Sequence, residues 1–155
     1  MPRLDYRQAS PEGIAVFRRL EAYVRESGLE ASLLELVRTR ASQINGCAYC
    51  LDMHTKDARA AGESEQRLHT LSAWRETPFF SERERAALAW TEAVTRIADA
   101  HVSDEVYSET AKHFHEKELV DLTLAIVAIN GWNRLAITFQ SPVGDYRPSR
   151  AVGGR

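Results

Sequence analysis

The chain has few cysteines, no large excess of either charge and no long uninterrupted apolar run. Two cysteines in 155 residues are too few for the disulfide framework of a small secreted domain. Lys and Arg number 20 against 22 Asp and Glu, without the basic block that a dedicated nucleic-acid or membrane-surface binder needs. The longest apolar stretch, residues 119–137, is interrupted by Asp121 and Arg134 and predicts a buried helix. We therefore expect neither nucleic acid nor a membrane as partner.

The chain ends differ from the middle in composition. The first ten residues carry Arg3, Asp5 and Arg7 with no apolar run behind them, unlike a secretory signal, so we expect a cytoplasmic location. Hydrophobic residues make up 44% and charged residues 27%, which suits one packed core. We predict a single domain over residues 1–140. Residues 141–155 contain several prolines and glycines and predict an irregular C-terminal arm or tail.

Apolar residues recur with helical rather than strand spacing, which predicts an all-α fold, a compact single-domain helical bundle. Helix signals include Ser10-Pro11, the Asn45-Gly46 pair and a capping box from Ser81 to Glu84. The expected helices cover about residues 11–27, 31–45, 47–61, 64–71, 82–97, 104–114 and 116–139. In the fifth of them we expect these residues to face inward: Ala86, Trp90, Ala93, Val94 and Ile97.

Both cysteines fall in one four-residue window, Cys47-Ala48-Tyr49-Cys50, with His54 four residues later. Cys47, Cys50 and His54 stand at i, i+3 and i+7, so one face of a helix carries all three. Cys47 lies at the helix start, where free N–H groups lower a thiol pKa, and His54 is close enough to Cys50 to exchange a proton. The pattern predicts an activated dithiol, with zinc bound by these three residues and Glu35 as the alternative.

Glu35 is a candidate partner for His54, from the preceding helix. Its neighbours Leu34 and Leu36 leave little of that turn for solvent, so we expect the carboxylate to point toward the cysteine helix. Burial would then raise its pKa toward the working pH and suit it to acid/base work. The alternative is an ordinary surface carboxylate on an amphipathic helix.

The complete pattern resembles alkylhydroperoxidase D and its relatives in the carboxymuconolactone decarboxylase superfamily. Glu35 stands twelve positions before Cys47, Cys50 closes the Cys-x-x-Cys, and His54 follows four positions later. In that family these spacings form the peroxidase centre. The likeness extends from about Leu33 through the helix containing residues 130–134 and is greatest to the small, single-domain, peroxidase-related branch.

The resemblance implies a thiol-dependent peroxidase that reduces organic hydroperoxides with no metal and no organic cofactor. Cys50 would attack the peroxide, Cys47 would close a disulfide, Glu35 and His54 would relay protons, and an external thiol or dithiol would reduce the disulfide. Helix-terminus electrostatics favours Cys47 as the more acidic thiol instead, so the order of attack stays open. Relatives assemble as homo-oligomers, trimers or hexamers, and we expect the same here.

The chain departs from the family pattern at Tyr49, where the characterised enzyme often has a second histidine. A neutral phenol is a poor base near pH 7, which predicts slower or differently driven turnover. Two other functions remain open. One is a carboxymuconolactone decarboxylase-like enzyme, which works without a cysteine pair, and the other is a redox sensor or thiol-disulfide partner that does not turn over.

The segment Asn130-Gly131-Trp132-Asn133-Arg134 interrupts an otherwise apolar helix with polar groups. Such groups need hydrogen-bond partners if they are buried. We expect a helix–helix or subunit contact here, with Gly131 allowing close approach.

Overall fold

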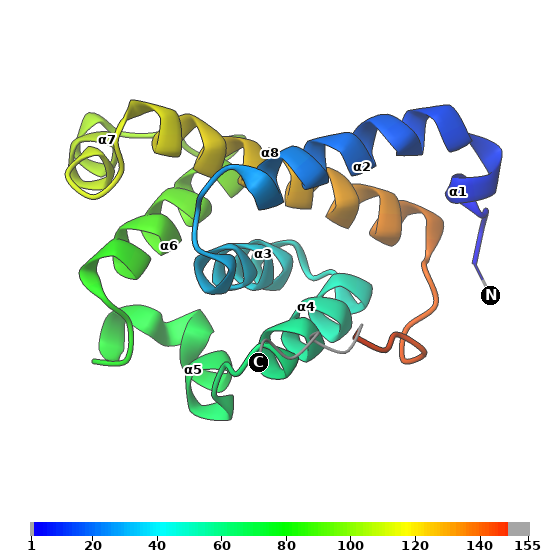
Figure 1. Cartoon of the computed structure of the whole chain (residues 1–155), viewed down its shortest axis with the longest axis horizontal. Helices are drawn as coiled ribbons and strands as arrows, with labels where there is room; N and C mark the ends of the chain where they lie inside the picture. The colour runs from blue at the N-terminus through cyan, green and yellow to red at the C-terminus, as the bar shows by residue number, and fades with distance from the viewer. Residues whose placement is uncertain (1, 149–155) are drawn as a thin grey trace.

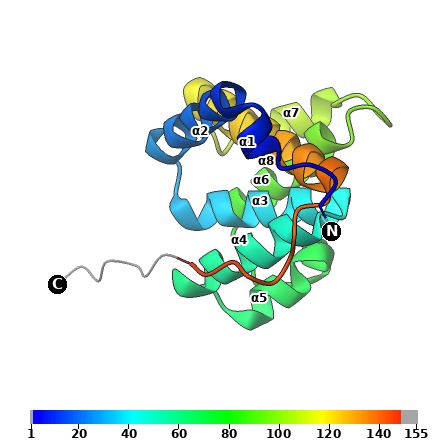
Figure 2. The same ribbon diagram turned by 90° about the vertical axis from the view of Figure 1, so that its right-hand side faces the viewer.

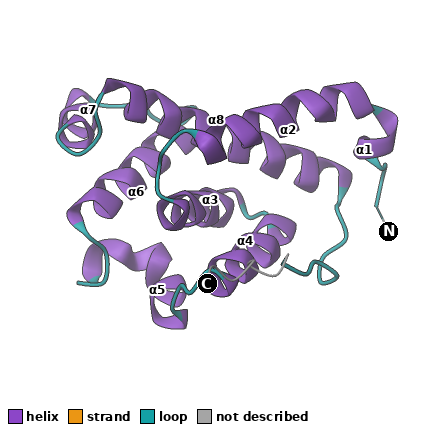
Figure 3. Ribbon diagram, in the orientation of Figure 1, coloured by secondary structure: helices purple, strands orange, loops and turns teal. Residues whose placement is uncertain are grey.

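The computed structural model describes residues 2–148, and within that range the chain consists of helices and loops without a strand (Figure 3). The helices are α1 (Tyr6–Ala9), α2 (Pro11–Glu26), α3 (Ala31–Asn45), α4 (Ala48–Ala60), α5 (Glu65–Thr70), the 3-10 helix η1 (Leu71–Glu76), α6 (Glu82–Thr95), α7 (Asp104–Ala111) and α8 (Glu116–Phe139). The predicted all-α fold is confirmed. The short α1 and η1 were not predicted.

Helix α3 lies at the centre of the molecule. It packs against α4, α6 and α8, while α2 lies alongside α8 as an outer layer (Figures 1 and 2). The apolar face of α3 supplies Leu33, Leu34 and Val37 to the main core, where each is at most 2% exposed. Burial of such side chains contributes about 1.5–3 kcal/mol each. The element that carries Glu35 is therefore held rigidly on several sides.

Local signals define most helix ends as predicted. Ser81 and Glu84 form the capping box, and Ser64 and Ser103 each accept a hydrogen bond from a backbone N–H of the helix that follows. The prediction for Ile97 is wrong. Helix α6 ends at Thr95, so Ile97 follows the last helical turn and is 56% exposed.

Helix α8 is long and apolar enough, by length and composition, to cross a membrane, with a mean hydropathy of 1.3 in its most apolar window. The core helix of a folded domain passes the same test. Leu122, Ile126 and Ile129 are fully buried against the rest of the chain, and Asp121 is buried with its carboxylate bonded to Tyr23 and Lys117. The helix serves the core, as its interrupted apolar pattern predicts.

Residues 141–148 follow α8 without helix and run beside α4 (Figure 2). Tyr146 donates a hydrogen bond to Asp57 at 2.7 Å, and its carbonyl accepts one from Lys56 at 3.2 Å. This segment therefore contacts the helix that carries the cysteines. The remainder of the predicted arm, residues 149–155, lies outside the described residues.

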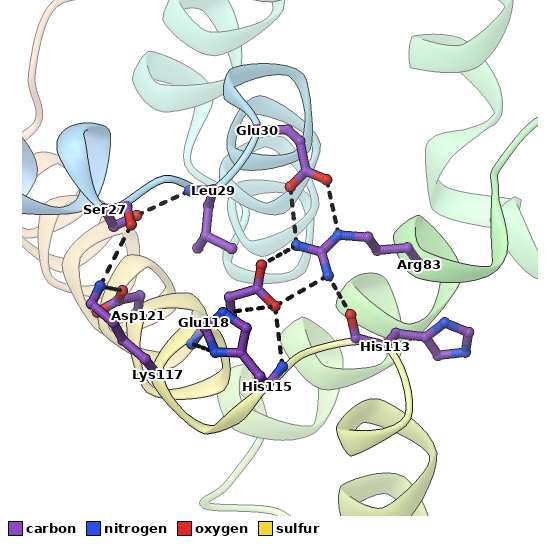
Figure 4. Close-up of polar contacts among 9 residues, drawn as sticks. All are labelled: Ser27, Leu29, Glu30, Arg83, His113, His115, Lys117, Glu118 and Asp121. Atoms are coloured by element: carbon purple, nitrogen blue, oxygen red, sulfur yellow. Dashed lines mark hydrogen bonds and ion pairs between the residues drawn. The ribbon is translucent and has the colours of Figure 1, made fainter.

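Arg83 joins three elements near the start of α8 (Figure 4). Its guanidinium donates to Glu30 at the start of α3, to Glu118 in the first turn of α8 and to the carbonyl of His113. It also lies 4.0 Å from the ring centre of Phe114. These bonds hold the pKa of Glu118 below its usual value and connect segments far apart in sequence.

Replacing Arg83 with glutamine is expected to lower the free energy of unfolding at pH 7 by about 1–3 kcal/mol, because several charge-assisted hydrogen bonds are lost together. Urea denaturation measures this change. Arg19→Gln, at an exposed position of α2, is the control and should shift stability by less than about 0.5 kcal/mol. An Arg83 variant as stable as this control would contradict the prediction.

Gly131 lets α8 approach α2 closely, as the sequence predicts. A Cβ at this position would lie 2.4 Å from Cζ of Phe17, well inside contact distance. Phe17 also packs edge-on against Trp132, with ring centres 5.0 Å apart. The polar neighbour Asn133 is fully buried and bonded to Ser42 and Asn45 of α3, so its hydrogen-bonding groups have partners.

Gly131→Ala is expected to destabilise the fold by about 1–3 kcal/mol through overpacking against Phe17. Thermal or urea unfolding of the single variant gives the cost. The same substitution in a Phe17→Ala background should recover most of it, because the ring that clashes is gone. An equal loss of stability in both backgrounds would mean that a contact other than the one with Phe17 causes the destabilisation.

Candidate active site

The turn between α3 and α4 positions the two cysteines. Gly46 ends α3 in the left-handed conformation, with φ of 70°, and the chain reverses directly into α4. Cys47 is the N-cap of α4, and its Sγ accepts a hydrogen bond from the backbone N–H of Cys50 at 3.3 Å. The two cysteines are joined as a disulfide, with their Cα atoms 5.4 Å apart and each residue 1% exposed. The predicted pair is therefore assembled.

Glu35 and His54 meet across the α3–α4 contact. His54 is buried on α4, and its Nδ1 lies 2.9 Å from Oε2 of Glu35. The other carboxylate oxygen accepts a hydrogen bond from Arg38 at 2.8 Å. The inward orientation predicted for Glu35 is thus observed, and its surface alternative does not hold.

The prediction that the pKa of Glu35 is raised is wrong. Burial is the largest single influence and raises the pKa, but hydrogen bonding and charge from His54, together with Arg38, outweigh it and leave the pKa below its usual value. Glu35 is therefore a carboxylate at neutral pH and can only accept at His54 Nδ1. Neutral His54 then carries its proton on Nδ1 and leaves Nε2 free to act as a base.

Arg38 was not among the predicted site residues. It is 9% exposed and bridges two carboxylates, Glu35 on its own helix and Glu21 of α2 at 3.0 Å. The i, i+3 spacing from Glu35 was a usable signal in the sequence. The partner Glu21 lies seventeen residues away, and only the packing of α2 against α3 brings it there.

A cavity of about 290 Å³ opens in front of Cys50. Cys50 and His54 lie in its wall together with side chains of α1, α2, α4 and α8, namely Tyr6, Arg7, Arg18, Glu21, Tyr49, Met53 and Trp132. Cys47 instead lines a separate hollow of about 220 Å³ beside the start of the C-terminal segment, with Gln140, Ser141 and Val143. Cys50 and Cys47 thus border different cavities.

Tyr49 occupies the position at which the characterised enzyme of the family often has a second histidine. Its phenol accepts a hydrogen bond from Arg7 at 3.2 Å, a contact between residues 42 positions apart. The short helix α1, which begins at Asp5 as N-cap, brings Arg7 there. The phenol is therefore engaged with a cation, and its residue forms part of the cavity wall in front of Cys50.

The zinc-ligand set considered from the sequence is not brought together as four free ligands, because Cys47 and Cys50 bond to each other. A different group, Glu35, His54 and Asp57, has ligand atoms within 4.8 Å of one another. Arg38 places a permanent positive charge on Glu35, and Tyr146 donates to Asp57. Both contacts compete with a cation at this position.

The fold and the site define a class: an all-α protein with a Cys-x-x-Cys pair at a helix start, of the alkylhydroperoxidase D type. A model of the carboxymuconolactone decarboxylase family matches residues 11–93, and the chain belongs to this family. The matched range includes all four predicted site residues, Glu35, Cys47, Cys50 and His54.

Individual relatives agree with this assignment. The uncharacterised protein YdfG of Bacillus subtilis is 44% identical over 135 residues, which cover 87% of this chain and 92% of YdfG. A crystal structure from Agrobacterium tumefaciens has a TM-score of 0.89 and 46% identity, covering 93% of this chain and all of the other. That protein is of unknown function and is described as a candidate antioxidant defence protein AhpD.

The debrominase Bmp8 shares the fold at lower identity. Its TM-score is 0.80 at 21% identity, covering 89% of this chain and 74% of the debrominase. This likeness concerns the fold alone. Family, fold and cysteine pair together support a peroxidase-related or decarboxylase-like role.

Proposed function

We propose that this protein is a thiol-dependent peroxidase that reduces organic hydroperoxides through a dithiol/disulfide cycle at Cys47 and Cys50. The observation that carries the proposal is that Cys50 and His54 line one cavity while Glu35 holds His54 Nδ1 at 2.9 Å. This arrangement supplies a nucleophile, a base and a group that orients the base. It favours Cys50 as the attacking thiol, because the same cavity is not lined by Cys47.

The reaction balances with the groups present and one hydroperoxide. The Cys50 thiolate attacks the terminal peroxide oxygen, the O–O bond breaks, and the departing alkoxide takes a proton to leave as an alcohol. Cys50 is then a sulfenic acid. The Cys47 sulfur attacks the Cys50 sulfur, the S–O bond breaks, and water leaves as the disulfide forms. An external thiol or dithiol reduces the disulfide and restores both thiols.

His54 and Glu35 provide the proton path. The free Nε2 of His54 takes the Cys50 thiol proton, and the carboxylate of Glu35 stabilises the imidazolium that results. His54 then returns the proton to the departing alkoxide. Glu35 also borders a second cavity of about 380 Å³, lined by Ser32 and Glu63 among others, which gives this relay a route to solvent.

Intact mass spectrometry tests the proposal directly. Reduced protein receives one equivalent of cumene hydroperoxide, is quenched with excess alkylating agent and is then denatured. Loss of two protons without added alkyl groups is the expected result, followed by repeated turnover with excess dithiol. Disulfide formation without turnover would indicate a redox sensor. Two alkyl groups on otherwise unmodified protein would reject the peroxidase.

The decarboxylase-like alternative makes the opposite prediction about the thiols. A Cys47→Ser, Cys50→Ser double variant would retain decarboxylase activity on a carboxymuconolactone, since that chemistry needs no cysteine pair. Under the peroxidase proposal the double variant is inactive toward hydroperoxides. The position of the cysteine pair at a helix start favours the redox function.

We also propose that the protein forms a homo-oligomer, a trimer or a hexamer. Large apolar side chains are exposed on α2 and α8, including Val16 at 55%, Val120 at 59% and Val127 at 49%. Exposed apolar groups gathered on neighbouring helices are typical of subunit interfaces. Light scattering should give a multiple of the 17.5 kDa chain mass, and a mass equal to one chain would contradict the prediction.

A further inference from the structure

The cavity in front of Cys50 has a positive charge that the chain itself does not neutralise. Glu21 contributes the only carboxylate among its lining residues, and it shares the guanidinium of Arg38 with Glu35. Arg7 and Arg18 line the same cavity. Within residues 2–148, neither of them forms an ion pair with a carboxylate. Two guanidinium groups therefore remain available to a ligand.

Arg7 is placed to bind an anion. Its side chain is half-buried, and its guanidinium lies 4.8 Å from the ring centre of Tyr6 and 5.7 Å from that of Tyr49. It donates one side-chain hydrogen bond, to the phenol oxygen of Tyr49. A guanidinium has five N–H donors, and a partly desolvated one gains most from a carboxylate that accepts two of them.

Arg18 approaches the cavity from a different element. It is an exposed residue of α2, whereas Arg7 belongs to α1 and Cys50 to α4. The remaining wall contains the largely apolar side chains of Tyr6, Met53 and Trp132. An occupant of this cavity of about 290 Å³ therefore meets apolar surface, two cations, the ion-paired carboxylate of Glu21 and the side chain of Cys50 in one space. That volume is at the lower end of ligand pockets, which suits a small organic molecule.

We infer that this cavity binds small organic molecules that carry a carboxylate, with Arg7 and Arg18 as the residues that determine specificity. On the proposed function, on which this inference rests, the preferred substrates are hydroperoxides that have both an apolar body and a carboxylate. The carboxylate binds the guanidinium groups while the peroxide oxygen meets Cys50. A neutral hydroperoxide gains the apolar contacts but leaves both cations without a partner, and this difference creates the preference.

A matched pair of substrates tests the inference. Cumene hydroperoxide with a para-carboxylate is compared with its methyl ester, which lacks the negative charge and carries one additional methyl group. For the wild-type protein we expect kcat/KM to be about tenfold higher for the carboxylate, an ion-pair gain discounted for solvent exposure. In an Arg7→Gln, Arg18→Gln double variant the ratio should fall to about one, because KM for the carboxylate rises.

Two controls separate site binding from general charge effects. Arg19→Gln removes an exposed charge next to Arg18 from a residue that does not line the cavity, and it should keep the wild-type ratio. Arg7→Lys keeps the charge without the planar donor pair and should retain part of the preference. Equal kcat/KM values for acid and ester in the wild-type protein would overturn the inference while leaving the peroxidase intact.

A binding measurement keeps the inference separate from the proposed function. Calorimetry compares 4-isopropylbenzoate with 4-isopropylbenzamide, neither of which is a peroxide. Tighter binding of the acid, lost in the double variant, supports the carboxylate site even if neither hydroperoxide is turned over. Equal binding of both compounds, or binding of neither, would overturn it.

Discussion

Cys50→Ser is expected to reduce hydroperoxide turnover by about a thousandfold or more, because the attacking thiolate is lost. A serine hydroxyl in the same position is not ionised near neutral pH and is a poor nucleophile toward a peroxide oxygen. The measurement is peroxide consumption coupled to a dithiol reductant. Because serine and cysteine are similar in size, the circular dichroism spectrum should match that of the reduced wild-type protein.

Cys47→Ser is the matched variant, and it separates the role of the attacking cysteine from that of the resolving cysteine. It should still consume about one equivalent of hydroperoxide and then stop, because Cys50 becomes a sulfenic acid with no resolving thiol. A reagent specific for sulfenic acid should label Cys50 in this variant. If Cys47→Ser lost the first reaction and Cys50→Ser kept it, the order of attack would be reversed, as helix-terminus electrostatics by itself favours.

Glu35→Gln is expected to lower kcat/KM for hydroperoxides by about a hundred- to ten-thousandfold, although Glu35 does not line the cavity in front of Cys50. Glu35 acts as a positioning residue through His54. An amide cannot stabilise the imidazolium, and it no longer enforces the tautomer with Nε2 free. Steady-state kinetics over a range of pH measures the effect.

The pH profile distinguishes positioning from a purely structural role. In the wild-type protein the negative charge of Glu35 stabilises the imidazolium that forms when His54 takes the Cys50 proton, and so favours the thiolate of Cys50. Without that charge, the rising limb of activity should move to higher pH by about one unit, so the loss is greatest in acid. Glu35→Asp keeps the charge on a shorter side chain and should keep the wild-type limb. A uniform loss at all pH values would contradict the role given to Glu35.

Stability should respond to pH in a related way. The pKa of Glu35 is lower in the folded protein than in the unfolded chain, since His54 and Arg38 outweigh its burial. Its contribution to stability is therefore present above the unfolded value of 4.5 and is lost as pH falls through the folded value. Chemical denaturation of the wild-type protein should show this acid loss, and the Glu35→Gln variant should show less of it.

The helix boundaries and the grouping of Cys47, Cys50 and His54 could be predicted because both depend on residues within a few positions of one another. Helical geometry alone places i, i+3 and i+7 on one face. Asn45-Gly46 marks the reversal into α4, and Gly46 adopts the left-handed conformation that the sequence indicates. The contact of Glu35 with His54 could be predicted because that reversal folds α4 back against α3, and because the family resemblance includes both residues.

The environment of these residues depends on segments that the sequence does not connect. Contrary to the prediction, the pKa of Glu35 lies below its usual value, because His54 and Arg38 both contact its carboxylate. Local sequence determined which residues share a helix face. Only the packing of α1, α2 and α8 around α4 decided that Cys50 borders a cavity with Arg7 and Arg18, because such contacts depend on how distant apolar faces fit together.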